Sequence, residues 1–225
     1  MRRFELPAVI VLAAALRLLV LFLWFPELSG DALDYDRLAR SLVEGRGYVN
    51  AMGEPTSWRP PLYPAFVAVG YIFSGGSIQG VRLLQVALDL GTVVFTYVIG
   101  RLLFGWGPGL VAALLVTLNL GTVAATGRLL SETLFTFLLM AGVTLSILWL
   151  RAIRGSRVTA AVALGMGTGA LLGAGTLARG VLLLYPLCLV VLVALGLRVW
   201  ESPSVEGPSV SERRRAALLG CLVLV

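Results

Sequence analysis

The sequence predicts an all-α, polytopic membrane protein whose first loop lies outside the membrane and carries short helices at the membrane edge. The 225-residue chain is 58% hydrophobic and only 13% charged, whereas a soluble domain is roughly 25% charged. Several stretches of about 20 residues hold at most one or two charges, as membrane-spanning helices do. One long polar interval, residues 30–64, separates the first of these stretches from the rest.

The first element is an apolar run at residues 7–25 that follows two arginines. It is similar to a signal peptide, but no small-residue cleavage site follows and the run is long enough to span, so we expect an uncleaved helix. The loop at 26–77 follows, with an amphipathic helix at 31–44. A second helix at 62–73 is too short to cross and is expected to lie at the membrane edge or to re-enter the membrane.

Five more spans are expected after this loop, each an apolar run between polar turns. They cover residues 78–104, 109–126, 131–150, 158–177 and 181–199. The last apolar run, 216–225, would form only about 15 Å of helix at about 1.5 Å per residue, half of the roughly 30 Å that a span needs. We therefore expect a seventh span that is cut short and a chain that is the N-terminal part of a longer protein.

The arginine distribution predicts the orientation in the membrane. All 18 basic residues are arginines, and short loops rich in arginine stay in the cytoplasm. The loops on one side hold Arg2, Arg3, Arg101, Arg151, Arg154, Arg157, Arg198 and Arg213 to Arg215. The short turns on the other side hold only Arg128 and Arg179. We therefore expect a multi-pass protein of the cell membrane with a cytoplasmic N-terminus, and we assign the net charge of +6 to topology rather than to nucleic-acid binding.

Neither a transition-metal centre nor a resident cofactor is expected. The chain has no histidine, and its two cysteines, Cys188 and Cys221, lie in apolar runs, where a free cysteine behaves as a small buried hydrophobic residue. The sequence leaves open whether a divalent cation takes part in any reaction.

The polar interval contains the main candidate for chemistry. At about 100° per residue, Tyr35 and Leu38 share one helix face and Asp31 falls at the head of that face, with Asp34 on its flank. Asp31 could be a helix N-cap with Asp34 in the first turn, or a general base whose pKa is raised at an apolar boundary, and the two roles are compatible. The opposite face is expected to be solvated and carries Asp36, Arg40 and Glu44.

Arg59 follows Trp58 and precedes two prolines, which fix φ and hold the chain extended. Trp58, Tyr48 and Tyr63 could be interfacial anchors or the rim of a site for an anionic head group and a sugar.

Ser131 and Glu132 could be the N-cap and first turn of a span. Arg128 could also pair with Glu132 at i,i+4 spacing, and Arg128 and Arg179 at the same level could hold a phosphate. Deeper in the membrane, Arg17 and Asp89 fall at similar depth, and we expect them to pair structurally because unpaired charges there are costly. Asp89 shares its helix face with Arg82 and Gln85.

In this order, one N-terminal span, GDALDYDRLARSLVEGRGY, PTSWRPPLYP, RLLQVALDLGTVVFTYVIGRLLFG, RLLSETLFTF and a Thr-Leu-Ala-Arg junction resemble the N-terminal half of the C-type polyprenyl-phosphate-dependent glycosyltransferases. That superfamily includes protein O-mannosyltransferases and lipid A aminoarabinose transferases. The resemblance implies a membrane enzyme that moves a sugar, with inversion, from a lipid-linked polyprenyl phosphate to a glycan, lipid or protein acceptor on the outer face.

The resemblance also implies residue roles. Asp31 matches the acid that deprotonates the acceptor, and many members have a second acid where this chain has Ala32. Asp34 could replace that acid, the arginines would hold the phosphate, and Glu132 would orient substrate. The candidate substrate-binding residues are Asp34, Tyr35, Trp58, Arg59, Tyr63, Arg128, Glu132 and Arg179. Two alternatives are a non-catalytic scaffold or lipid-binding subunit of the same fold and, because of the midplane charges, a transporter.

Overall fold

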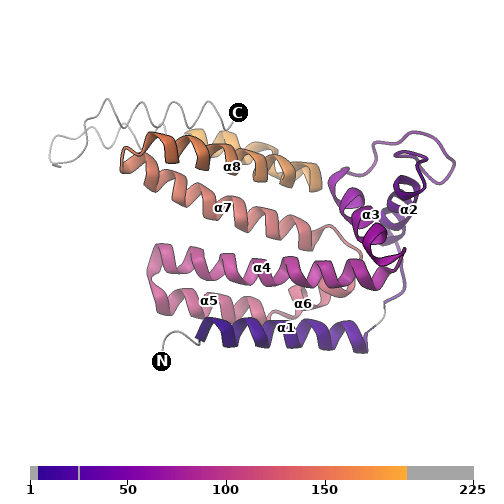
Figure 1. Ribbon diagram of the computed structural model, residues 1–225, viewed down its shortest axis with the longest axis horizontal. Coiled ribbons are helices and arrows are strands. Elements are labelled where there is room, and N and C mark those ends of the chain that lie inside the picture. The colour runs from indigo at the N-terminus through magenta and orange to yellow at the C-terminus, as the bar shows by residue number, and fades with distance from the viewer. Residues whose placement is uncertain (1–4, 25, 192–225) are drawn as a thin grey trace. The chain divides into compact units, whose positions relative to one another are not determined.

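The computed structural model describes residues 5–24 and 26–191, and over these residues the predicted all-α membrane fold is confirmed (Figure 1). Four of the described helices are long and apolar enough to cross a membrane, or up to five if one bent pair forms a single span. The described elements are α1 (Glu5–Leu23), α2 (Asp31–Val43), α3 (Leu62–Ser74), α4 (Ile78–Phe104), α5 (Trp106–Leu118), α6 (Leu120–Gly127), α7 (Glu132–Arg154), α8 (Val158–Ala178) and a 3-10 helix, η1 (Gly180–Leu184).

The expected span at 109–126 is wrong as one continuous helix. It is two helices, α5 and α6, which meet at a bend of 51°. Asn119 causes the break: its backbone is extended, and its side-chain oxygen accepts hydrogen bonds from the backbone N–H groups of Gly121 and Thr122. A side chain that competes in this way for backbone donors ends one helix and caps the next.

Two expectations concern the C-terminal part of the chain. Cys188 is exposed rather than buried. The expected span at 181–199 is described only to residue 191, where helix follows η1, and the run at 216–225, with Cys221, lies outside the described residues.

The chain divides into two units, which are considered separately. The first comprises residues 1–137 with 177–179. In it, α4 packs against α1, α3, α5 and α6. The core between α1, α4 and α5 contains Val9, Ala13, Val93, Tyr97 and Ala113.

The second unit comprises residues 138–176 and 180–225, of which the structure describes residues up to 191. It contains most of α7 and most of α8. Small residues let these two helices approach closely, as is usual between membrane helices. A Cβ added at Gly142 would lie 2.9 Å from a methyl group of Leu172.

The loop helices sit at the N-terminal end of α4 in the first unit (Figure 1). α2 packs on α3, and α3 on α4. α2 begins after Gly30 at φ 53°, and α3 ends at Gly75 at φ 65°, a left-handed conformation that glycine adopts without steric cost. These two glycines let the chain turn sharply on either side of the helix pair.

Candidate functional site

The loop brings the Trp-Arg-Pro-Pro segment to the start of α2. Nη2 of Arg59 lies 2.6 Å from Oδ1 of Asp31 and 2.8 Å from Oδ2 of Asp34, and Nε of Arg59 lies 3.3 Å from the same Asp34 oxygen. One guanidinium therefore bridges both acids across the loop.

The backbone of Arg59 is held in place by neighbouring residues. The hydroxyl of Tyr48 donates to the backbone carbonyl of Arg59 at 2.8 Å, and Pro60 stiffens the chain beyond it. Burial raises the pKa of Tyr48 to about 12. The hydrogen bond to Asp34 is the largest cause that raises the pKa of Arg59, so this side chain stays charged.

The structure corrects the expected geometry of α2. Gly30, not Asp31, is the N-cap residue. Tyr35 and Leu38 are buried as the periodicity indicates, but the Asp31 side chain is 53% exposed. The expectation of a solvated opposite face is wrong at Asp36, which is only 13% exposed because it accepts hydrogen bonds from the Tyr71 hydroxyl and from Arg40.

Tyr63 is fully buried, so it is neither an interfacial anchor nor part of an open rim. Its ring meets that of Tyr35 edge-on at 4.7 Å, and its hydroxyl donates to Gln85 at 2.6 Å. Nε2 of Gln85 in turn donates to the backbone carbonyls of Thr126 and Arg128 at 3.0 and 2.8 Å. This chain of contacts links α2 to the segment between α6 and α7.

The expected pair between Arg128 and Glu132 does not form. Arg128 is extended, at the end of α6, and so does not share a helix with Glu132. Glu132 instead pairs with Arg179 at 3.0 Å. Arg128 lies over the ring of Trp24, at 5.2 Å from its centroid.

Two cavities lie in this region of the first unit. The first, of about 290 Å³, is lined by Trp24, Pro26, Glu27, Leu28, Ser29, Ala32, Arg82, Arg128, Leu129 and Leu130. The second, of about 310 Å³, is lined by Asp34, Arg37, Leu38, Val49, Asn50, Ala51, Thr56, Trp58 and Arg59. Of the candidate residues, Arg128 lines the first cavity, and Asp34, Trp58 and Arg59 line the second.

Sequence reasoning did not select Trp24, Glu27 or Arg82 as site residues. Arg82 carried a usable signal, since it is an arginine in the second turn of a span at the same end as the polar loop.

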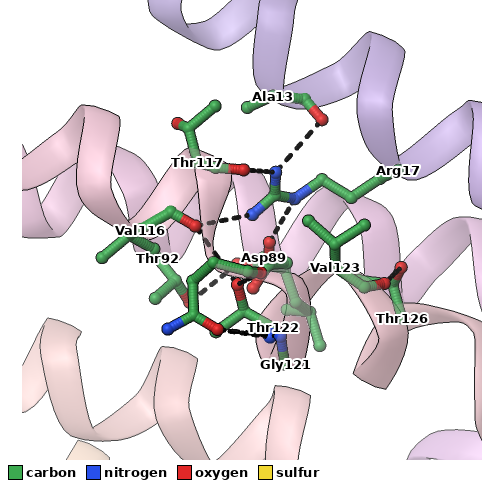
Figure 2. Close-up of polar contacts among 12 residues, drawn as sticks. Ala13, Arg17, Asp89, Thr92, Val116, Thr117, Gly121, Thr122, Val123 and Thr126 are labelled. Atoms are coloured by element: carbon green, nitrogen blue, oxygen red, sulfur yellow. Dashed lines mark hydrogen bonds and ion pairs between the residues drawn. The ribbon is translucent and has the colours of Figure 1, made fainter.

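Arg17 and Asp89 form the expected ion pair inside the helix bundle (Figure 2). The Arg17 guanidinium also donates to the carbonyls of Thr117 at 2.9 Å and Val116 at 3.3 Å. Those carbonyls are at the end of α5, where the break at Asn119 removes their helical partners. The Arg17 guanidinium therefore supplies hydrogen-bond donors to the carbonyls at the end of α5, and the Asp89 carboxylate neutralises its charge. The pair thus has a structural role.

Between residues 5 and 191, residue 25 apart, the structure gathers no three acidic or cysteine side chains that could hold a metal ion. The groups that the site offers to a ligand are carboxylates, guanidinium groups and aromatic rings. Such a set suits the binding of a phosphate and a sugar.

Residues 58–206 match the family described as dolichyl-phosphate-mannose-protein mannosyltransferase. The chain belongs to this family. No curated protein and no solved structure matches the sequence significantly.

Membership in the mannosyltransferase family identifies the chain as a multi-pass membrane protein of the C-type glycosyltransferase class. The family match begins at Trp58 and so includes Arg59 but not α2. Asp31 and Asp34 thus lie outside the matched residues, and their ion pairs with Arg59 connect them to the matched part of the chain.

Proposed function

We propose that this protein transfers a sugar from a polyprenyl-phosphate donor to an acceptor hydroxyl on the extracytoplasmic face, with inversion at the anomeric carbon. The Arg59 bridge is the observation that supports this function most. It places a candidate base, Asp31, one hydrogen bond away from a cation within the family match. The loop that carries both is polar and follows a span, as an enzyme working at the membrane surface requires.

In the proposed reaction Asp31 accepts the proton of the acceptor hydroxyl while that oxygen attacks the anomeric carbon. The bond from this carbon to the phosphate oxygen breaks, and its electron pair stays on the phosphate. Because arginines stabilise that charge, the leaving group needs no proton and one base is sufficient. Attack from the side opposite the phosphate inverts the anomeric carbon in a single displacement.

The neighbouring residues receive roles from their positions. Asp34 holds Arg59 by two hydrogen bonds, so Arg59 can stay in place while Asp31 turns to the acceptor. Trp58 is exposed and lines the second cavity with Asp34 and Arg59, where its ring can pack on a sugar face. Tyr35 and Tyr63 are buried and support α2 rather than contact the sugar.

The test replaces the candidate base. Asp31→Asn should lower transfer from radiolabelled decaprenyl phosphate mannose to cell-envelope extract by about a hundredfold or more, as expected for the loss of a general base. Binding of the donor should change by less than about twofold, because Asn keeps the shape of the side chain. The matched control is Glu44→Gln, at the other end of α2, which removes the same charge from a side chain that is 54% exposed.

Transfer that survives in Asp31→Asn would rule out Asp31 as the base. A wild-type protein that binds the donor without transferring sugar would be a lipid-binding subunit. Accumulation of solute in vesicles without any lipid-linked donor would indicate a transporter.

A further inference from the structure

We infer that Gln85, a buried amide of the span α4, is a positioning residue that holds the Arg59 bridge in place through two buried tyrosines of the loop helices. The Arg59 bridge is the guanidinium of Arg59 together with the carboxylates of Asp31 and Asp34 that it pairs with. The inference rests on the proposed function, because it gives Gln85 a part in the same reaction.

The side-chain amide of Gln85 is fully buried and uses both of its ends. Its Nε2 donates to the backbone carbonyls of Thr126 and Arg128 at 3.0 and 2.8 Å. These carbonyls are at the C-terminal end of α6, where no further turn of helix supplies donors. Because the two N–H groups of the amide are needed there, its oxygen has to face the other way. The end of α6 therefore fixes the orientation of Gln85.

The oxygen of this amide accepts a hydrogen bond from the hydroxyl of Tyr63 in α3 at 2.6 Å. Tyr63 is fully buried, so its hydroxyl has no access to water as an alternative partner. A buried hydroxyl that loses its partner is costly, whereas the apolar contacts between α3 and α4 have no preferred direction. The hydrogen bond to Gln85 therefore sets where α3 lies along the span.

Tyr63 passes this position on to the Arg59 bridge through Tyr35 of α2. The two rings meet edge-on, with their centroids 4.7 Å apart, and Tyr35 is 5% exposed. The guanidinium carbon of Arg59 lies over the Tyr35 ring, 5.6 Å from its centroid, within the range of a cation–π contact. The guanidinium that holds both acids therefore rests on a ring that packs against Tyr63.

This arrangement matters because the Arg59 bridge joins distant parts of the loop. Arg59 follows Asp34 by 25 residues and Asp31 by 28, so no single helix fixes their geometry. A displacement of about 1 Å at reacting groups can lower a rate about a hundredfold. If Gln85 only satisfied the carbonyls of α6, loss of its contact with the loop would lower stability without a particular effect on turnover.

Tyr71 provides a matched control on the same helix. It is 2% exposed, and its hydroxyl also donates to a mostly buried side chain, the carboxylate of Asp36 in α2. This bond joins the two loop helices to each other and not to α4. Without it, Asp36 keeps its hydrogen bonds from Arg40. Tyr71→Phe therefore removes a comparable hydrogen bond and leaves the contacts between Gln85 and the Arg59 bridge intact.

The first test measures transfer by the full chain from decaprenyl phosphate mannose and determines kcat and the donor KM separately. Tyr63→Phe and Gln85→Met should each lower kcat about tenfold or more and change KM less than about twofold, because they displace reacting groups without removing a donor contact. Tyr71→Phe should change kcat less than about twofold. Equal kcat values for Tyr63→Phe and Tyr71→Phe overturn the inference, as does a Tyr63→Phe variant that changes KM alone.

A double-variant cycle tests the route through Tyr35. Tyr35→Leu keeps an apolar side chain at this position but removes the ring that contacts both Tyr63 and Arg59. In this background Tyr63→Phe should lower kcat further by less than about twofold, because contacting residues that act in series are not additive. Effects that multiply in full would show that Tyr63 does not act through the Arg59 bridge.

A spin label measures the position of the loop without sugar transfer. The label is attached to Ser57→Cys, two residues before Arg59, after both native cysteines are replaced by alanine. Tyr63→Phe and Gln85→Met should increase the mobility of the label, and Tyr71→Phe should leave it as in the wild type. If Gln85→Met does not fold, Tyr63→Phe decides, and unchanged mobility in that variant overturns the inference.

The two measurements separate this inference from the proposed function. If Tyr63→Phe mobilises the label while the wild type transfers no sugar, Gln85 positions the Arg59 bridge and the proposed function fails. If Asp31→Asn loses transfer while Tyr63→Phe matches Tyr71→Phe in kcat and in label mobility, the proposed function stands and the role of Gln85 fails.

Discussion

At the scale of single residues, one charged side chain, Arg17, is buried inside the helix bundle. Arg17 sits inside the bundle because four groups accept hydrogen bonds from its guanidinium: the carboxylate of Asp89 and the carbonyls of Ala13, Val116 and Thr117. A charge at such depth would otherwise be expensive. Transporters use broken helices of this kind to bind ions, but here a side chain of the protein itself occupies the carbonyls.

Removal of Asp89 should therefore be severe. Asp89→Asn leaves the guanidinium of Arg17 buried without a counterion, and we expect a loss of about 3–5 kcal/mol in the free energy of unfolding. The charge exchange Arg17→Asp with Asp89→Arg should recover part of this loss, because it restores the ion pair but not the bonds from Arg17 to the end of α5. Reversible unfolding in mixed micelles measures both. A double variant no more stable than either single variant would contradict the structural pair.

The raised pKa of Tyr48 predicts how the stability of the protein depends on pH. Its folded pKa of about 12 lies above the ordinary value of 10.0 for the unfolded chain, so the folded state holds this proton more tightly. The stabilisation is fully present below pH 10 and is lost as the pH rises towards about 12. The difference between the ultraviolet titrations of the wild type and Tyr48→Phe should be centred near pH 12, and a centre near pH 10 would show that the phenol is not shielded.

At the scale of the elements, composition and periodicity predicted the helices better than their interruptions. α4 occupies the expected range, 78–104, because a long apolar run between two glycine-containing turns is typical of one continuous helix. The bend at Asn119 was missed because the run from 109 to 126 stays apolar on both sides of it. The local signal was the polar Asn119 itself, whose preference for a cap outweighs helix continuity.

The candidate site, too, could be predicted only in part from the sequence. The sequence indicated that Asp31, Asp34 and Arg59 belong together, since one polar interval holds all three. It did not indicate that Arg59 would bridge the two acids, because that contact depends on how the loop folds back over 25 and 28 residues. The sequence did not indicate the cavity at Arg82, because that cavity is formed by three separate parts of the chain, residues 24–32, Arg82 and residues 128–130.

The contact between α4 and α5 depends on glycine. A Cβ added at Gly100 would lie 2.7 Å from the Cα of Gly109, and two backbones cannot yield as a flexible side chain can. We expect Gly100→Ala to lower the free energy of unfolding by about 1–3 kcal/mol, as overpacking does. Gly173→Ala on α8 is the control: nothing lies within 4 Å of its added Cβ, and it should raise stability by about 0.5–1 kcal/mol. Equal effects of the two changes would contradict a close approach of α4 and α5.

At the scale of the whole molecule, the arginine distribution predicts which side of the membrane each loop faces. We expect a cytoplasmic N-terminus, the loop at 26–77 outside, and the turn between α7 and α8 inside, because that turn is flanked by arginines.

Cysteine labelling checks this orientation. In a background with Cys188→Ala and Cys221→Ala, Ser57→Cys should react with a membrane-impermeant maleimide in intact cells. Gly155→Cys should react only after the cells are opened. Labelling in the reverse order would place the Arg59 bridge on the cytoplasmic side and would contradict the proposed extracytoplasmic reaction.

The buried arginine of the first helix also bears on how the protein is made. α1 leaves the ribosome before α4 and α5: Asp89 follows Arg17 by 72 residues, and the carbonyls of Val116 and Thr117 follow it by 99 and 100 residues. Until those partners are synthesised, the guanidinium needs water or lipid phosphates around it. We therefore expect α1 to reach its final depth only after α4 and α5 have been translated.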